Sequence, residues 1–289
     1  MTTKTPQSIE INQPNYRVYS HAGEWIQGPI LCPRTGNFEK VLVTLRTNTL
    51  RTSFTYNSNN NYRHGKKIQN LAEKLATKYH AHIDPCHFMK FSNIPIGVGL
   101  GSSTSDLVAF TFAYLHELGV RLTHLQTYQM ATEYEGYSDP LYDSRTFLFN
   151  SKSKKELYSL PSIGKKYKAA LTFSKQVREI VTDELQFNYT QEDIEKFKVI
   201  EAAFRRGITT ANFKMIFAAA DASAVQNQHH MSLDDYDEIK DICSRYAMGF
   251  SISHSGSAIV IHAEDQNLAL VRKVLAGEGY ESKKITISL

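Results

Sequence analysis

The residues best suited to bind phosphate lie in a glycine-rich segment, residues 93–109, with the sequence NIPIGVGLGSSTSDLVA. Its three glycines are Gly97, Gly99 and Gly101. Glycine adopts backbone angles that other residues avoid, so this backbone can approach a bulky anion closely. Ser102 or Ser103 is a good N-cap for the apolar helix expected over residues 102–119. Because a helix N-terminus carries unsatisfied N–H groups and a partial charge of roughly +0.5, the segment predicts a nucleotide-phosphate site.

Two common phosphate motifs do not fit this segment. A P-loop needs a lysine after its last glycine, and Gly101 is followed by two serines. The dinucleotide-binding pattern with its later acidic residue is not found either. The segment resembles instead the phosphate loop of the GHMP kinases, whose pattern P-x-x-x-G-L-G-S-S it matches without a gap. The resemblance implies that ATP binds at Pro95, Gly97, Gly99, Leu100, Gly101, Ser102, Ser103 and Thr104.

A second stretch, residues 21–28 (HAGEWIQG), lies near the N-terminus. Taken alone, it is equally consistent with a strand, a turn and a strand that carry one exposed glutamate. Within the GHMP kinases it resembles the G-E-x-I-Q-G segment of the bacterial L-threonine kinases of cobalamin biosynthesis. That resemblance implies that Glu24, Gln27 and Gly28 bind the acceptor. The same subgroup carries S-S-T-x-D after its phosphate loop, which makes Asp106 a subgroup marker; a carboxylate that complements the helix dipole from the first turn is the alternative.

Residues 133–140 (EYEGYSDP) supply carboxylates, which phosphoryl transfer to an alcohol needs. The hydroxyl must lose its proton, and Mg²⁺ must be held against the phosphate oxygens. An acidic residue before a proline is also a common turn former. The resemblance implies that Asp139 is the catalytic base beside the acceptor, and that Ser103 and Glu135 hold the metal, with Glu133 as the alternative to Glu135. No lysine in the first motif assists the hydroxyl, so Asp139 is expected to act largely alone.

The segment over residues 249–261 (GFSISHSGSAIVI) reads on its own as a hairpin with a small-residue turn. It resembles, in position and in sequence, the third motif of the threonine-kinase subgroup, which is a loop that packs under the phosphate loop. This implies that His254, Ser255 and Gly256 bind the acceptor. Upstream, a helix that ends in Asn-Gln resembles the same subgroup and makes Asn227 and Gln228 candidate contacts, with a solvent-facing helix end as the alternative.

The remaining pattern predicts the elements that must position these residues. Strands are expected at residues 16–19, 41–46, 50–56, 87–91, 169–173, 248–253, 258–262 and 284–289, and helices at 67–79, 102–119, 125–135, 191–206, 212–227, 233–246 and 266–277. Their segregated order predicts an α+β protein. The resemblance implies the GHMP kinase fold: a ribosomal-protein-S5-like ATP-binding domain over residues 1–160 and a ferredoxin-like domain over residues 161–289.

Composition excludes several other classes of protein. The 289 residues are 42% hydrophobic, with no apolar run of the ~20 residues that a membrane span needs and no signal-peptide core at the start. A cytoplasmic protein without a membrane partner is expected. The cysteines, Cys32, Cys86 and Cys243, form no C-x-x-C pair, so neither a disulfide framework nor a structural zinc site is indicated. A formal net charge of +4 is too small to predict a nucleic-acid partner.

The sequence thus predicts a small-molecule kinase that uses ATP and Mg²⁺. The resemblance favours L-threonine as acceptor, with O-phospho-L-threonine and ADP as products and a homodimer as one possible assembly. Homoserine, serine or the precursor of a specialised metabolite is the alternative acceptor. A GHMP-fold binding module without catalysis is the alternative of another class.

Overall fold

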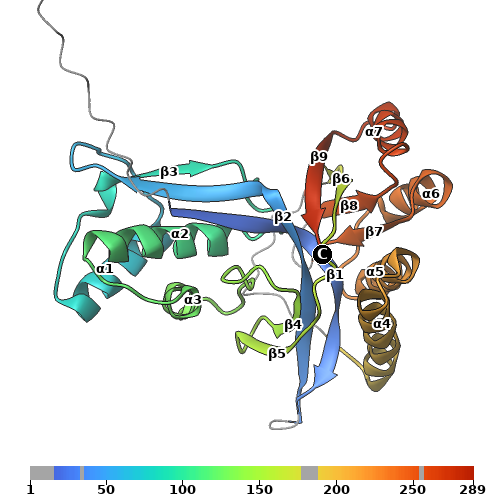
Figure 1. Ribbon diagram of the computed structural model, residues 1–289, viewed down its shortest axis with the longest axis horizontal. Helices are drawn as coiled ribbons and strands as arrows, with labels where there is room; N and C mark the ends of the chain where they lie inside the picture. Colours follow the sequence, from blue (N-terminus) through green and yellow to red (C-terminus); the bar gives the residue numbers. More distant parts are fainter. Residues whose placement is uncertain (1–15, 33–35, 177–187, 254–256) are drawn as a thin grey trace, which may run out of the picture.

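The computed structural model describes residues 16–32, 36–176, 188–253 and 257–289 (Figure 1). Its strands are β1 (Tyr16–Leu31), β2 (Phe38–Tyr56), β3 (Phe88–Ser92), β4 (Phe147–Asn150), β5 (Lys155–Ser159), β6 (Lys166–Phe173), β7 (Gly249–Ile252), β8 (Ala258–His262) and β9 (Ser282–Ser288). Its α-helices are α1 (Lys66–Tyr79), α2 (Ser102–Glu117), α3 (His124–Thr132), α4 (Gln191–Thr209), α5 (Phe213–Gln228), α6 (Tyr236–Tyr246) and α7 (Leu268–Gly277).

The C-terminal half is an antiparallel sheet with the spatial order β9-β6-β8-β7. Along the chain, helices α4, α5 and α6 lie between β6 and β7, and α7 lies between β8 and β9. This is the β-α-β-β-α-β arrangement of ferredoxin-like domains, with α4, α5 and α6 in the place of one helix. Figure 1 shows these helices together on one side of the sheet. The expected ferredoxin-like topology is confirmed.

The N-terminal half is built on the long hairpin of β1 and β2, to which β3 and β4 add. Helices α1 and α2 lie against one face of the β1–β2–β3 part (Figure 1). Their apolar side chains pack with those of the strands around Phe54, Phe88 and Phe110, which are fully buried. The α+β class predicted from the sequence therefore holds for both halves.

Strand β2 connects the two halves, because Thr47 pairs with Ile287 of β9 after the strand has paired with β4. One hydrophobic core accordingly contains residues of both halves, with Trp25 stacked on His262 at a ring-centroid distance of 5.0 Å. The division into residues 1–160 and 161–289 stays a prediction.

Most expected elements are confirmed within a few residues, and the differences have physical causes. The strands expected at 41–46 and 50–56 are one strand, because the polar residues between them pair across to β9. The first strand continues through residues 21–28, so the turn considered there is wrong. Helix α3 ends at Thr132, short of residue 135. The short strands β4 and β5 were not expected, since four or five residues carry too little alternation to be recognised. No helix in the described ranges is long and apolar enough to cross a membrane.

Gly28 tests how tightly β1 packs against α4. A Cβ atom at Gly28 would lie 2.3 Å from Cδ2 of Phe197, which is buried. We expect Gly28→Ala to lower the free energy of unfolding by about 2 kcal/mol through overpacking. Gly277→Ala is the control, since no heavy atom lies within 4 Å of its added Cβ. Urea unfolding of both variants measures the difference, and equal midpoints would contradict it.

Candidate active site

Helix α2 begins in a left-handed turn at Gly101, where the glycine-rich loop ends. Gly97, Gly99 and Gly101 all have positive φ, 78°, 78° and 67°. Gly101 is the N-cap residue and provides no side-chain cap, so the N-cap predicted at Ser102 or Ser103 is wrong. Glycine takes this place because the left-handed conformation is costly for other residues. The first-turn N–H groups that a serine cap would have bonded remain available to a ligand.

The loop is supported from two distant parts of the chain. The Ser20 hydroxyl of β1 donates to the Leu100 carbonyl. The backbone N–H of Ala258 donates to the Val98 carbonyl at 3.2 Å, and the Ser253 hydroxyl reaches the same oxygen at 3.4 Å. The two flanks of the third motif therefore hold the phosphate loop. His254, Ser255 and Gly256 themselves lie outside the described residues.

Ser103 and Glu135, the residues predicted to hold the metal, lie together. The Ser103 hydroxyl donates to Oε1 of Glu135 at 2.8 Å, and the Thr104 hydroxyl donates to Oε2 at 3.3 Å. Burial raises the pKa of the Glu135 carboxyl above its ordinary value, although Lys67 and Ser103 lower it. A carboxylate in such a place is stabilised by a cation. Glu133 is exposed.

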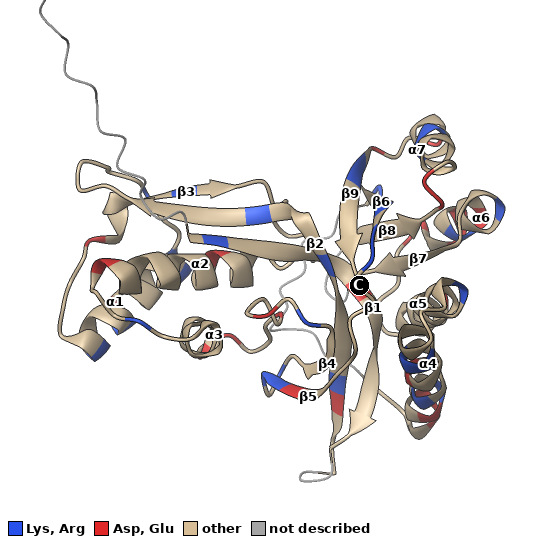
Figure 2. Cartoon of the chain, viewed as in Figure 1, with Lys and Arg blue, Asp and Glu red and all other residues tan. Residues whose placement is uncertain are grey.

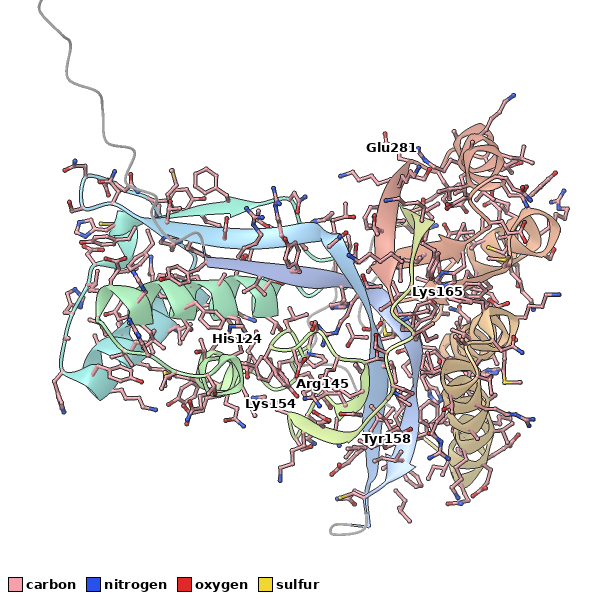
Figure 3. The ribbon with its side chains drawn as sticks, in the orientation of Figure 1. His124, Arg145, Lys154, Tyr158, Lys165 and Glu281 are labelled. Atoms are coloured by element: carbon pink, nitrogen blue, oxygen red, sulfur yellow. The ribbon has the colours of Figure 1, made fainter. Side chains whose placement is uncertain are left out.

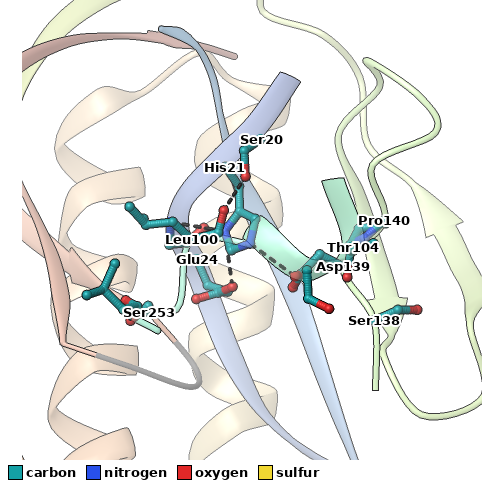
Figure 4. A network of polar contacts seen from close by, with 12 residues as sticks. Ser20, His21, Glu24, Leu100, Thr104, Ser138, Asp139, Pro140 and Ser253 are labelled. Carbon is teal, nitrogen blue, oxygen red and sulfur yellow. Dashed lines mark hydrogen bonds and ion pairs between the residues drawn. The ribbon is translucent and has the colours of Figure 1, made fainter. Parts of the chain in front are cut away.

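Asp139 lies beside Gly101 and forms a buried ion pair with His21 (Figure 4). Nε2 of His21 is 3.3 Å from Oδ2 of Asp139, and its Nδ1 is 3.6 Å from Oε1 of Glu24. The exposed fractions of the three residues are 0% for His21, 2% for Glu24 and 7% for Asp139. The exposed glutamate considered for residues 21–28 is therefore wrong. The lack of a lysine in the first motif led us to expect no cationic neighbour for Asp139, but the imidazole of His21 lies beside it.

The charge of this cluster follows from its surroundings. Burial lowers the pKa of His21, but Asp139 and Glu24 outweigh burial and raise it from 6.5 to about 9. Lys40 interacts electrostatically with Glu24. Burial lowers the pKa of the Lys40 ammonium to about 7, although the Glu24 carboxylate raises it. His21, Glu24 and Asp139 are also the one group of three potential metal ligands found close together in the described part of the chain. A raised imidazole pKa favours a proton over a metal ion there.

Irregularities in β1 bring His21 and Glu24 to the same side. The pairing of β1 with β2 shifts register between Tyr19 and His21, between His21 and Glu24, and between Glu24 and Ile26. Regular strands place successive side chains on opposite faces, and such bulges redirect them. Gly23 has φ of 117°, and a Cβ there would lie 3.3 Å from the backbone of Ile252. The glycine in this motif is thus required by backbone geometry and by close contact with β7.

Basic side chains hold the segment that carries Asp139. Nη2 of Arg46 donates to the Pro140 carbonyl at 2.7 Å, and the Lys154 ammonium donates to the Thr132 carbonyl at the end of α3. Arg145 forms ion pairs with Asp143 and with a glutamate of β5. Figure 3 shows Arg145 and Lys154 close to β4 and β5. Sequence patterns could not identify the roles of Arg46 and Lys154, because their partners are backbone carbonyls distant in the chain.

A cavity of about 240 Å³ opens next to Ser103, between the first turns of α1 and α2. Its lining residues are Tyr62, Arg63, His64, Gly65, Lys67, Ile68, Lys90, Ser103, Asp106 and Leu107. Asp106 does not act as a first-turn carboxylate: it accepts from the Thr52 hydroxyl at 2.9 Å and pairs with Lys90. Three of the lining residues, Arg63, Lys67 and Lys90, are basic.

The other predicted acceptor contacts lie on the α5 side of β1. Nε2 of Gln27 donates to the Ile252 carbonyl at 3.2 Å, and the Gln27 backbone bonds to Ser223 of α5. Asn227 is four residues further along α5 and is buried. Gly28 packs on Phe197. The acceptor roles of Gln27, Gly28 and Asn227 stay predictions. Pro95, a predicted ATP contact, lies in the loop before Gly97, and its role stays a prediction as well.

Figure 2 shows acidic and basic residues in both halves of the described chain. Both signs alternate along α4, with ion pairs such as Lys196 with Glu192 at 2.8 Å. This agrees with the small net charge of the chain.

Comparisons with known proteins found similar chains. Residues 66–149 match the family model described as GHMP kinases N terminal domain. A homoserine kinase of Oceanobacillus iheyensis is 38% identical over 73 residues, which are 25% of this chain and 24% of that enzyme. The crystal structure of the Methanococcus jannaschii mevalonate kinase is similar with a TM-score of 0.70 and 13% identity, over 97% of this chain and 99% of the other. The crystal structure of homoserine kinase from Cytophaga hutchinsonii is similar with a TM-score of 0.64 and 14% identity, over 99% of this chain and 98% of the other.

The chain therefore has the GHMP kinase fold, and the predicted fold class is confirmed. The curated match spans about a quarter of each protein, and the structural matches have low sequence identity. Function must accordingly be argued from the site.

Gly101 tests whether the turn and the His21–Asp139 pair depend on each other. A Cβ at Gly101 would lie 2.7 Å from Nε2 of His21 and 3.0 Å from Oδ2 of Asp139. Gly119→Ala is a matched control, with φ of 70° and open space around the added atom. We expect the control to lose about 1 kcal/mol of unfolding free energy from backbone strain, and Gly101→Ala to lose roughly 1–3 kcal/mol more from overpacking. Equal losses of unfolding free energy for the two variants in urea titrations would show that the added Cβ does not clash with the His21–Asp139 pair.

The protonated state of His21 predicts a pH dependence of stability. The folded pKa of about 9 exceeds the ordinary value of 6.5, so the folded protein holds a proton that the unfolded chain releases between these values. The stabilisation from His21 is complete below about pH 6.5 and is lost as the pH rises toward about 9. We expect the unfolding free energy of the wild type to fall relative to that of His21→Gln over this range. His116→Gln, at an exposed position, is the control; parallel curves for the wild type and His21→Gln would show that His21 is not the titrating group.

Proposed function

We propose that this protein is an ATP-dependent kinase that phosphorylates the side-chain hydroxyl of a small amino acid, with L-threonine as the favoured acceptor. The observation that carries this proposal is the convergence at Gly101 of a helix N-terminus, the Ser103–Glu135 pair and the His21–Asp139 pair. A phosphate-binding element and a buried carboxylate thus lie within one side-chain length of each other. Transfer of a phosphoryl group to a hydroxyl needs this juxtaposition.

The phosphate end of the site fits a nucleotide with Mg²⁺. The Ser103 hydroxyl and the largely buried Glu135 carboxylate are hard oxygen donors of the kind that Mg²⁺ prefers. When bound there, the ion would neutralise charge on the phosphate oxygens. The N–H groups of the first turn of α2 and the hydroxyls of Ser102 and Ser103 would then hold the phosphates and stabilise the charge that spreads over them during transfer.

Asp139 receives the proton of the acceptor hydroxyl. The His21 imidazolium 3.3 Å away favours the carboxylate over the carboxylic acid and fixes its orientation. His21 is in turn held by Glu24 and by the Gly23 backbone, whose carbonyl accepts from the protonated Nδ1 at 3.3 Å. His21 therefore positions the base without needing to contact the acceptor.

The acceptor end contains buried charges of both signs. Glu24 carries a carboxylate beside His21, and Lys40 lies within its electrostatic reach. Such charges suit the ammonium and carboxylate groups of an amino acid. The resemblance of residues 21–28 and 102–106 to the threonine-kinase subgroup supports L-threonine. The similarity to a homoserine kinase over 73 residues supports L-homoserine as the second candidate.

An acceptor panel tests this proposal, with a base variant as its control. We expect purified protein to release ADP from Mg·ATP with L-threonine at a higher kcat/KM than with L-homoserine or L-serine. Asp139→Asn should reduce that rate on the order of 100-fold to 10,000-fold, because the amide cannot accept the proton. Asp241→Asn, which alters an exposed carboxylate of α6 paired with Arg245, should retain the rate. Preference for L-homoserine would establish the second candidate, while ADP release that is unchanged in Asp139→Asn would place the base elsewhere.

A further inference from the structure

Lys67 occupies the position in which a cation bound to Ser103 and Glu135 would lie. Its ammonium donates to Oγ of Ser103 at 3.0 Å and to Oε1 of Glu135 at 3.2 Å, and these two oxygens are 2.8 Å apart. Mg²⁺ bound to the same oxygens would lie about 2.1 Å from each. Two cations cannot share so small a space, because like charges at this distance repel strongly. The pair already holds one cation, and that cation belongs to the chain itself.

Lys67 can leave this position at little cost. Its side chain is 65% exposed, whereas that of Glu135 is 10% exposed. An ion pair with one exposed partner contributes little to stability, and lysine has a long, flexible stem. Glu135 is held in place by the Ser103 and Thr104 hydroxyls. The lysine is therefore the mobile member of the group.

The 240 Å³ cavity gives the displaced ammonium a destination. Lys67 is one of its lining residues, together with Ser103 and Lys90. Lys67 stands in the first turn of α1, so the cavity lies between two helix N-termini. The phosphate loop has no lysine after Gly101, in contrast to a P-loop. A triphosphate bound at α2 would lack a side-chain cation from its own loop.

We propose that Lys67 is a displaceable counter-ion, which holds the Ser103–Glu135 pair in the nucleotide-free protein and moves onto the triphosphate when a Mg²⁺–nucleoside triphosphate complex binds. This inference rests on the proposed kinase function. It assigns to α1 the lysine that the phosphate loop does not provide. It also makes the metal-binding oxygens unavailable to free divalent ions until a triphosphate arrives to receive the ammonium.

Amine acylation of the wild-type protein gives the first test. Lys67 and Lys78, at opposite ends of α1, are both exposed and should react with an acylating reagent, as read by mass spectrometry of peptides. We expect Mg²⁺ with a non-hydrolysable ATP analogue to protect Lys67 and to leave Lys78 reactive. Equal reactivity of Lys67 with and without the bound analogue would overturn the inference.

Binding by Lys67→Met gives the second test, with Lys78→Met as the control. Loss of a charged contact with phosphate should weaken binding of the Mg²⁺ complex of the analogue by roughly tenfold. Removal of the resident ammonium should have the opposite effect on Mn²⁺ alone, whose affinity for the nucleotide-free variant should rise severalfold. Thermal unfolding verifies that the variant is folded, as its exposed position leads us to expect.

The two proposals fail in different ways. The role of Lys67 is overturned if the Lys67→Met variant binds the Mg²⁺ complex of the analogue as tightly as the wild type does, or if it binds Mn²⁺ more weakly. Either result leaves the kinase proposal intact. A wild-type protein that binds no Mg²⁺ analogue complex in calorimetry overturns the proposed function and this inference with it.

Discussion

The site depends on a single backbone position, the left-handed turn at Gly101. The turn starts α2, and the absence of a side chain there leaves room for the His21–Asp139 pair, whose nearest atoms would lie 2.7 and 3.0 Å from a Cβ. The helix end that can hold phosphate and the carboxylate that can take a proton therefore meet at one residue. A larger residue would need both to move, which couples the conformation of the phosphate loop to the geometry of the base.

The two long strands transmit this constraint to the rest of the fold. Register shifts in β1 place His21 and Glu24 side by side, and the close contact of Gly23 with β7 fixes the bulge against the C-terminal half. Strand β2 passes from one half to the other and pairs with β9. The phosphate loop is bonded to β1 and to both flanks of the third motif. The site is thus supported by elements of both halves, although its polar residues come mostly from the N-terminal one.

Local patterns in the sequence predicted the segments that are locally determined. The loop at residues 93–101, the helix after it and the order of strands and helices in the C-terminal half were expected, because periodicity and glycine placement are properties of short stretches. The ferredoxin-like topology was implied by the family resemblance alone. Contacts between distant segments could not be predicted that way. His21 meets Asp139 and Lys67 meets Glu135 only through the fold. The N-cap prediction failed because serine is a common cap, whereas here the backbone angle of Gly101 determines where the helix starts.

The buried charges indicate that this part of the molecule is not optimised for stability. Asp139, His21, Glu24 and Lys40 alternate in sign and are each at most 7% exposed. Removing such groups from water costs several kcal/mol per ion, and their mutual attraction offsets this only when geometry and hydrogen bonds are favourable. Apolar side chains of similar volume would pack here without that cost. Since β1 also departs from regular pairing at this point, both the charges and the bulges weaken the strand where it passes the phosphate loop. Buried charges and irregular strand pairing thus occur at the same residues, and both are unfavourable for folding. The choice of residues at these positions is better explained by their chemistry than by their contribution to stability.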